Sequence, residues 1–301
     1  MSFDDLSEQL ASVVAITVTP FDADGKIDEK SYAAVVDRMV QGGISVVTVN
    51  GNTSEFATLS PAEAERALRI TVDAVADRAA VIAGVGHDLH SAVAAARSAD
   101  RAGARGVMVH QPAHPYVSLD GWVDYHRVIA AAVPELSVVP YVRSPRIGGA
   151  QIAALAEACP NVVGVKYAVA DPVRFASVAR DAGLDRLTWV AGLAELSAPG
   201  CFAVGATGFT SGLANVAPQL PVQMFRSLRA GEFGAAMEFW EFVRPFEELR
   251  AADESAGNVS VVKEALAQLG LCRRDVRPPA SVLAEADRTA VGVVLSSWNL
   301  L

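Results

Sequence analysis

Residues 13–18 read Val-Val-Ala-Ile-Thr-Val, a short apolar run that stops at Pro20. An amphipathic helical pattern follows over 28–39 and ends at Gly42 and Gly43. A short apolar run of this kind is typical of a buried strand, and apolar residues at helical spacing before a glycine are typical of a helix and its stop. The stretch therefore predicts one strand–loop–helix unit.

The same unit recurs along the chain. Seven further strand-like runs, separated by alanine-rich amphipathic stretches, lie at 45–49, 80–85, 106–110, 136–141, 162–167, 187–191 and 205–210. Short, fully apolar strands that alternate with helices indicate a parallel sheet buried on both faces. Eight such units over about 230 residues predict an α/β fold, a (β/α)8 TIM barrel, with an open doubly wound sheet as the alternative. Neither a G-x-G-x-x-G after the first strand nor a Walker-type loop occurs, which disfavours nucleotide binding.

The last part of the chain has a helical pattern only, over 218–230, 232–252, 259–269 and 282–298. A closed barrel has no further strand to form, so these segments should pack as extra helices. We therefore expect a barrel of residues 1–217 and a C-terminal helical extension of residues 218–301 packed on it.

Composition narrows the class of protein. A chain of 301 residues with 51% hydrophobic and 20% charged residues can bury a large core. The net charge of −9 disfavours nucleic acid and anionic membranes as partners, because both require a basic surface. No run reaches the ~18 apolar residues of a membrane span, and the acidic start lacks a signal-peptide core. We expect a soluble cytoplasmic protein, with Cys159, Cys201 and Cys272 as packing residues.

Lys166 interrupts the apolar run Val-Val-Gly-Val-Lys-Tyr-Ala-Val at 162–169, and it is one of only four lysines in the chain. Burial of a charge is costly, so a lysine in such a strand needs a reason. Unlike arginine, a desolvated lysine can lose its proton, and its neutral amine can attack a carbonyl to form an imine. The alternative is a snorkelling or ion-paired lysine at a strand end.

Polar residues gather where the predicted strands end, which is where barrel active sites lie. The run Asn-Gly-Asn-Thr-Ser-Glu at 50–55 can turn backbone N–H groups toward a carboxylate, although an ordinary Asx turn is the simpler alternative. Tyr141 can relay protons, and Arg143 or Arg146 can bind a carboxylate, unless the tyrosine only caps the barrel and the arginines are solvated. Gly208, in the glycine-rich end of the eighth run, can let substrate approach the backbone.

Together these segments resemble the pyruvate-dependent class I aldolases, the superfamily of dihydrodipicolinate synthase and N-acetylneuraminate lyase. The likeness covers nearly the whole chain. It comprises Ala-Ile-Thr-Val-Thr-Pro-Phe at 15–21, the 51–55 loop, which matches the family's G-T/S-T-G-E signature, Tyr141, the V-G-x-K strand at Lys166, and Asn-Val-Ser-Val-Val-Lys at 258–263.

This resemblance implies a lyase in which Lys166 forms a Schiff base with a small-molecule 2-keto acid and Tyr141 shuttles protons. It implies neither a cofactor nor a metal, and it implies a homotetramer. The residues expected to bind the keto-acid carboxylate are Gly51, Asn52, Thr53 and Ser54.

The chain departs from the synthase branch of this family at several positions. Asn52 replaces the first of two threonines, and Ser54 replaces the second glycine of the signature. His114 falls where the synthases have a relay tyrosine contributed across a dimer, and an imidazole can take over proton transfer near neutral pH. Arg146 matches the substrate-binding arginine of the synthases, with Arg143 as the alternative.

The 51–56 loop and the Gly-Leu-Ala-Glu at 192–195 also resemble the 5-keto-4-deoxyglucarate dehydratases, which adds Gly192 to the expected substrate site. The sequence therefore predicts a Schiff-base lyase or aldolase acting on pyruvate or a sugar-derived 2-keto acid, rather than an enzyme of lysine biosynthesis. A dehydratase and a non-catalytic keto-acid sensor are alternatives. A metal-dependent aldolase is a further alternative, with candidate ligands His87, His90, His110 and His114.

Overall fold

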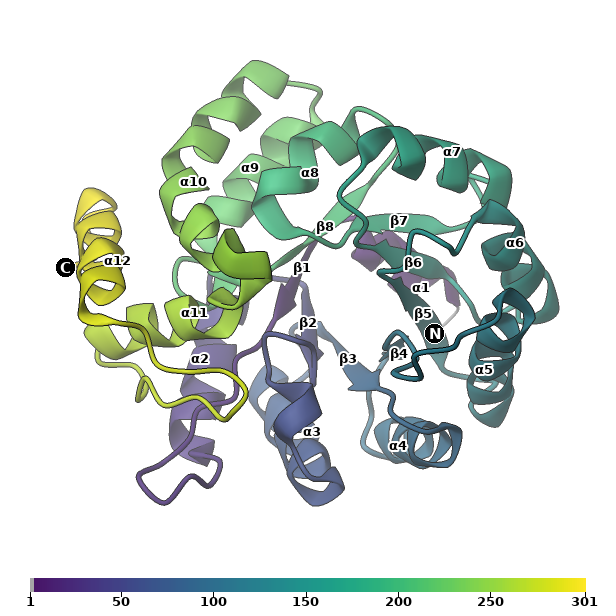
Figure 1. The fold of residues 1–301 in the computed structure, drawn as a ribbon, viewed down its shortest axis with the longest axis horizontal. Helices are drawn as coiled ribbons and strands as arrows, with labels where there is room; N and C mark the ends of the chain where they lie inside the picture. The colour runs from purple at the N-terminus through teal and green to yellow at the C-terminus, as the bar shows by residue number, and fades with distance from the viewer. Residues whose placement is uncertain (1–2) are drawn as a thin grey trace. The chain divides into compact units, whose positions relative to one another are not determined.

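The computed structural model describes residues 3–301. Its strands alternate with helices and follow one another in chain order around a closed barrel (Figure 1). The strands are β1 (Val13–Ile16), β2 (Val46–Val49), β3 (Ala80–Val85), β4 (Gly106–Val109), β5 (Ser137–Val142), β6 (Gly164–Tyr167), β7 (Thr188–Ala191) and β8 (Gly208–Ser211). The predicted TIM barrel is thus confirmed, and closure of the sheet rules out the open doubly wound alternative.

The helices between the strands are α2 (Glu29–Gln41), α3 (Pro61–Val75), α4 (Leu89–Arg101), α5 (Leu119–Ala132), α6 (Gly149–Ala158), α7 (Pro172–Ala182) and α8 (Ala194–Phe202). Short 3-10 helices, η1 (Phe56–Thr58) and η2 (Leu213–Asn215), follow β2 and β8. The C-terminal helices are α9 (Gln219–Arg229), α10 (Phe233–Ser255), α11 (Asn258–Gln268) and α12 (Glu285–Ser297). All four correspond to segments expected to be helical.

Local sequence explains where several helices begin. Asp28 accepts a hydrogen bond from the backbone N–H of Ser31 at the start of α2, as an N-cap should. Ser60 and Glu63 form a reciprocal capping box at the start of α3, followed by a proline in the first turn. These caps fix the residues at which α2 and α3 begin.

The chain divides into two compact units. The first unit contains the residues up to Val14 together with Ala80–Thr210. Within it β3 to β8 pair in parallel in chain order, and every residue of β5 and β6 is buried. This buried parallel arrangement is the one that the continuous apolar runs predict.

An N-terminal helix, α1 (Phe3–Leu10), was not expected from the sequence. Its buried Leu6 and Leu10 lie against the glycines that begin β4 and β6. A Cβ added at Gly106 would lie 2.7 Å from the Leu6 side chain, and one added at Gly164 would lie 3.2 Å from the Leu10 side chain. A helix of eight residues is marginal alone, so α1 depends on such tertiary contacts even though Leu6 and Leu10 recur at helical spacing.

The second unit contains Ala15–Ala79 and Ser211–Leu301. Helices α9 to α12 pack in series within it, and α2 packs against α3. The side chain of Asn215 accepts from the N–H of Val18 (3.0 Å) and donates to the carbonyl of Ile16 (2.8 Å), which ties the end of β1 to η2. The boundary expected between residues 217 and 218 stays a prediction. None of the helices in residues 3–301 has the length and apolarity needed to span a membrane.

Candidate active site

Lys166 and Tyr141 occupy adjacent positions on paired strands of the first unit. The parallel register of β5 and β6 places Tyr141 opposite Lys166, and Nζ of Lys166 lies 4.2 Å from the centroid of the Tyr141 ring. Both side chains are buried, with exposed fractions of 6% for Lys166 and 5% for Tyr141. The structure therefore brings the expected imine-forming amine and the expected proton relay into direct contact.

Burial changes the acid–base chemistry of Lys166. Loss of hydration lowers the pKa of Lys166 to about 7, and the positive charge of Arg143 acts in the same direction. An ordinary lysine titrates near pH 10.4, so almost none of it is neutral at pH 7. A substantial fraction of Lys166 is a neutral amine near neutral pH, which is the form that attacks a carbonyl.

Two histidines after β4 have different surroundings. His110 is buried at the end of β4, and its ring makes an edge contact with Tyr141 at a centroid distance of 6.0 Å. His114 lies in the exposed loop beyond it, where its Nδ1 accepts from the backbone N–H of Tyr116 (3.1 Å). The sequence suggested His110 only as a metal ligand; its place at a strand end was the signal for a role beside Tyr141.

The two candidate arginines also differ. Arg146 donates from Nη1 to the carbonyl of Val117 (3.1 Å), a contact that joins the loop after β5 to the loop after β4. Arg143 directly follows β5, and its charge acts on Lys166. Both side chains are exposed. Arg143 is therefore the arginine with a direct electrostatic link to the buried amine.

The loop after β2, in the second unit, is a tight turn between two left-handed residues, Asn50 (φ 58°) and Glu55 (φ 59°). The N–H groups of Ser54 and Glu55 donate back to the carbonyls of Gly51 and Asn52, both at 3.0 Å. Thr53 is buried, whereas Asn52 is exposed.

Ser54 was expected in the carboxylate site, and the structure gives its side chain a local structural function. Its hydroxyl donates to the carbonyl of Thr17 (2.6 Å) and accepts from the N–H of Gly51 (3.1 Å). Its own carbonyl accepts from the hydroxyl of Thr19 (2.7 Å). Ser54 is fully buried by these contacts, which connect the loop to the chain after β1.

The two expected glycines lie at opposite ends of their strands. Gly192 follows β7, and a Cβ there would come within 2.7 Å of the Ala168 side chain and 2.9 Å of the Tyr167 carbonyl. Gly208 is the first residue of β8, where a Cβ would collide with the carbonyl of Leu10. The expectation that Gly208 lies at the substrate end of its strand is corrected: residues 205–207 end the turn after α8, so β8 begins three residues later than expected.

A metal site is the alternative suggested by the four histidines near the ends of the third and fourth strands. Across residues 3–301, no group of three or more histidine, cysteine, aspartate or glutamate side chains is placed to hold a metal ion. The absence of a metal requirement stays a prediction.

Comparison with known proteins identifies the family. Residues 9–298 match the model of the dihydrodipicolinate synthetase family. A probable 5-dehydro-4-deoxyglucarate dehydratase from Rhodococcus opacus is 32% identical over 93% of this chain and 92% of that protein. A dihydrodipicolinate synthase from Bacillus clausii superimposes with a TM-score of 0.94 at 40% identity, covering 98% of this chain and 99% of that one.

A further solved structure was determined with a ligand. YagE of E. coli K12, a prophage protein of the dihydrodipicolinic acid synthase family in complex with pyruvate, superimposes with a TM-score of 0.86 at 25% identity, over 96% of this chain and 99% of that one. The family match covers the strands that carry Lys166 and Tyr141 as well as the loop at 50–55. The chain therefore belongs to the dihydrodipicolinate synthetase family.

Proposed function

We propose that this protein uses Lys166 to form an imine with pyruvate or a sugar-derived 2-keto acid. As a member of its family, the protein is a lyase of the class I aldolase type. The observation that carries the proposal is a buried lysine, with its pKa lowered to about 7, held against the ring of Tyr141. A lysine retained only for its charge has no need of a lowered pKa.

The proposed reaction follows from imine chemistry. The neutral amine of Lys166 attacks the keto carbon, the keto oxygen leaves as water, and a protonated imine remains. This cation draws electrons from the neighbouring carbon, which loses a proton and leaves an enamine. The enamine then attacks an aldehyde, or it expels a hydroxyl from the next carbon. In this proposal Tyr141 carries the protons, with His110 beside its ring and His114 as a further donor.

The proposed place for the keto-acid carboxylate is the loop at 50–55, with Thr53 as its main contact. The resemblance of this loop to the family's signature supports the assignment, and the family match covers the loop. Because the Ser54 hydroxyl and the Gly51 N–H are bonded to each other, we assign them to the shape of the turn. We assign the contact with the carboxylate to Asn52 and Thr53, which lie between these two residues in the loop.

Dehydration is the second candidate, and the relatives favour it. Curated relatives at about 30% identity are named probable 5-dehydro-4-deoxyglucarate dehydratases. A glucarate is a diacid, so such a substrate carries a second carboxylate beyond the keto acid. A guanidinium is suited to bind that group, and we propose Arg143 for it.

Covalent trapping tests the imine. Borohydride reduction in the presence of pyruvate should add a pyruvate-derived mass to the peptide that contains Lys166, with or without EDTA. The same experiment with 5-dehydro-4-deoxyglucarate should label Lys166 and, if the protein is a dehydratase, consume that substrate. Condensation of pyruvate with aspartate semialdehyde should be at least roughly 10²-fold slower than in a synthase, because relay residues are replaced. An unlabelled Lys166, or activity lost in EDTA, would contradict the proposal.

The two arginines can be separated by substitution. Arg143→Met should move the pH midpoint of trapping upward, because a positive charge that lowers the pKa of Lys166 is removed. It should also raise the KM for a diacid substrate by roughly 10- to 100-fold, the typical cost of an unpaired carboxylate. Arg146→Met, the matched control, should leave the pH midpoint in place. Equal midpoints in both variants would argue against the assignment of Arg143.

We also propose that the chain assembles as a homotetramer, with the exposed loop that carries His114 near a subunit interface. Members of this family are typically oligomeric, and Tyr116 in the same loop is 85% exposed in the single chain. Sedimentation velocity at micromolar concentration should give the mass of four chains, and a monomer would contradict the expectation.

A further inference from the structure

A buried ion pair lies directly behind the 50–55 loop in the second unit. Nζ of Lys263, on α11, lies 2.5 Å from Oε2 of Glu55, and the exposed fractions of the two side chains are 0% and 3%. The ammonium also donates to the carbonyl of Asp275 (2.7 Å) and lies 4.1 Å from the centroid of the Phe21 ring. A buried charge pair of this kind is costly to form and costly to break from one side.

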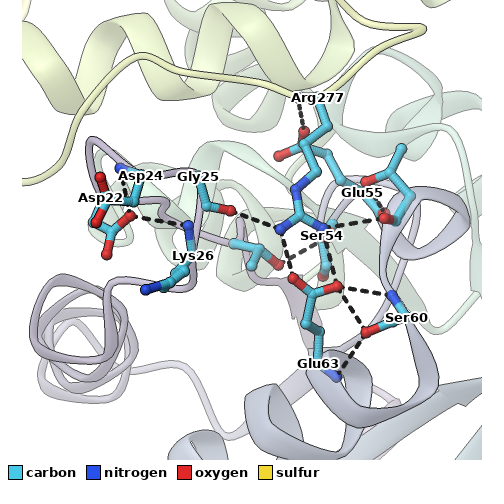
Figure 2. Close-up of polar contacts among 11 residues, drawn as sticks. Asp22, Asp24, Gly25, Lys26, Ser54, Glu55, Ser60, Glu63 and Arg277 are labelled. Atoms are coloured by element: carbon cyan, nitrogen blue, oxygen red, sulfur yellow. Dashed lines mark hydrogen bonds and ion pairs between the residues drawn. The ribbon is translucent and has the colours of Figure 1, made fainter.

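A second residue, Arg277, contacts Glu55 from the segment between α11 and α12. The backbone N–H of Arg277 donates to Oε1 of Glu55 (2.7 Å). Figure 2 shows the Arg277 guanidinium between the carboxylate of Glu63 and the carbonyl of Gly25. The guanidinium donates to the Gly25 carbonyl at 2.7 Å. It also donates to the carbonyl of Thr58 (3.1 Å). Arg277 thus links the C-terminal segment to both ends of the short stretch from Glu55 to α3.

These contacts occupy both carboxylate oxygens of Glu55, one with Lys263 and the other with the N–H of Arg277. A carboxylate held in this way is unsuited to act as a general base. The contacts instead fix the backbone at Glu55, whose left-handed conformation is unfavourable for a residue other than glycine. Asn50, the left-handed residue at the other end of the turn, is tied by its side-chain N–H to the carbonyl of Ala64 (3.0 Å).

We propose that Lys263 and Arg277 are positioning residues for the keto-acid carboxylate, acting through Glu55. By holding Glu55 in its left-handed conformation, they fix the direction in which Asn52 and Thr53 present their polar groups. The inference rests on the proposed function, since it assumes that this loop receives the carboxylate. It gives the C-terminal helical extension a role in substrate binding.

The rival explanation is electrostatic: the charge of Lys263 attracts an anionic substrate over a distance. A double substitution separates the two. Lys263→Met leaves the buried Glu55 carboxylate without its cation. Adding Glu55→Gln makes both side chains neutral, and the Gln carbonyl can still accept from the N–H of Arg277. If the lysine acts by positioning, the double variant recovers; if its charge attracts the substrate, the double variant stays impaired.

The experiment measures cyanoborohydride capture at Lys166 as a function of pyruvate concentration. Lys263→Met should raise the half-saturating concentration of pyruvate roughly 10- to 100-fold, as a displaced binding group does, with a small change in the limiting rate. Arg277→Met, which keeps its backbone N–H to Glu55, should give a smaller increase. Capture of methyl pyruvate, which lacks the carboxylate charge, should be the same in all variants. Arg66→Met, which removes the partner of an exposed ion pair with Glu29, is the matched control.

Recovery of pyruvate half-saturation in the double variant, together with unchanged capture of methyl pyruvate, would support the inference. Unchanged pyruvate half-saturation in both Lys263→Met and Arg277→Met would overturn it, as would a double variant no better than Lys263→Met. Equal losses with pyruvate and its ester would also overturn it, because they indicate general structural damage. A wild-type protein in which neither ketone labels Lys166 would overturn the proposed function, and this inference with it.

Discussion

Lys166→Arg is expected to abolish imine trapping and to lower turnover by at least roughly 10⁴-fold, the scale of losing a covalent nucleophile. The guanidinium keeps its proton at any pH at which the protein is folded, so it cannot attack a carbonyl although it preserves the positive charge. Lys166→Ala should lose as much. Measurement of borohydride-dependent mass and of keto-acid turnover checks both variants.

The control is Lys30→Arg, the same exchange at an exposed lysine, which should retain trapping and turnover. An active Lys166→Arg enzyme would mean that the lysine is merely electrostatic, and the Schiff-base mechanism would fall. The pH profile gives a second check, because burial lowers the pKa of Lys166 to about 7. The trapping rate should rise with pH up to about 7 and then level, whereas an ordinary lysine would still be gaining neutral amine near pH 10.

Tyr141→Phe is expected to lose roughly 10² to 10⁴ in turnover while Lys166 is still trapped by borohydride with pyruvate. The substitution keeps the ring over which Nζ of Lys166 lies and removes only the hydroxyl. Formation of the imine needs the amine, whereas its conversion to enamine and product needs a proton carrier. Single-turnover kinetics would show rapid labelling followed by a slow chemical step.

Tyr125→Phe is the matched control, because it removes a tyrosine hydroxyl that donates to the carbonyl of His87 (3.1 Å), outside the proposed site. Its turnover should stay within about threefold of wild type, as for most substitutions away from buried, strained or catalytic positions. Loss of trapping in Tyr141→Phe would assign the hydroxyl to imine formation itself. Full activity of Tyr141→Phe would instead assign the proton relay to His110 or His114.

The sequence alone was sufficient for the eight-stranded barrel because nearly every strand residue is buried and the strands are therefore mostly apolar. Lys166 could also be identified from the sequence, since a lysine inside such a strand is exceptional. Its family motif supported the same assignment, and the register of β5 and β6 places Tyr141 opposite Lys166. These features depend on patterns a few residues long.

Other features depended on contacts between distant segments, which a local pattern does not carry. Helix α1 is stabilised by Gly106 and Gly164, about 100 and 160 residues along the chain. Ser54 matches a position of the binding signature, but its hydroxyl is bonded to Thr17. The pairing of Glu55 with Lys263 joins residues separated by most of the chain, so no spacing could indicate it. Sequence therefore determined the barrel and singled out Lys166 as its candidate reactive amine. Only the tertiary structure decided which loop residues shape the turn and which residues hold it, because burial and hydrogen-bond partners are properties of the folded chain.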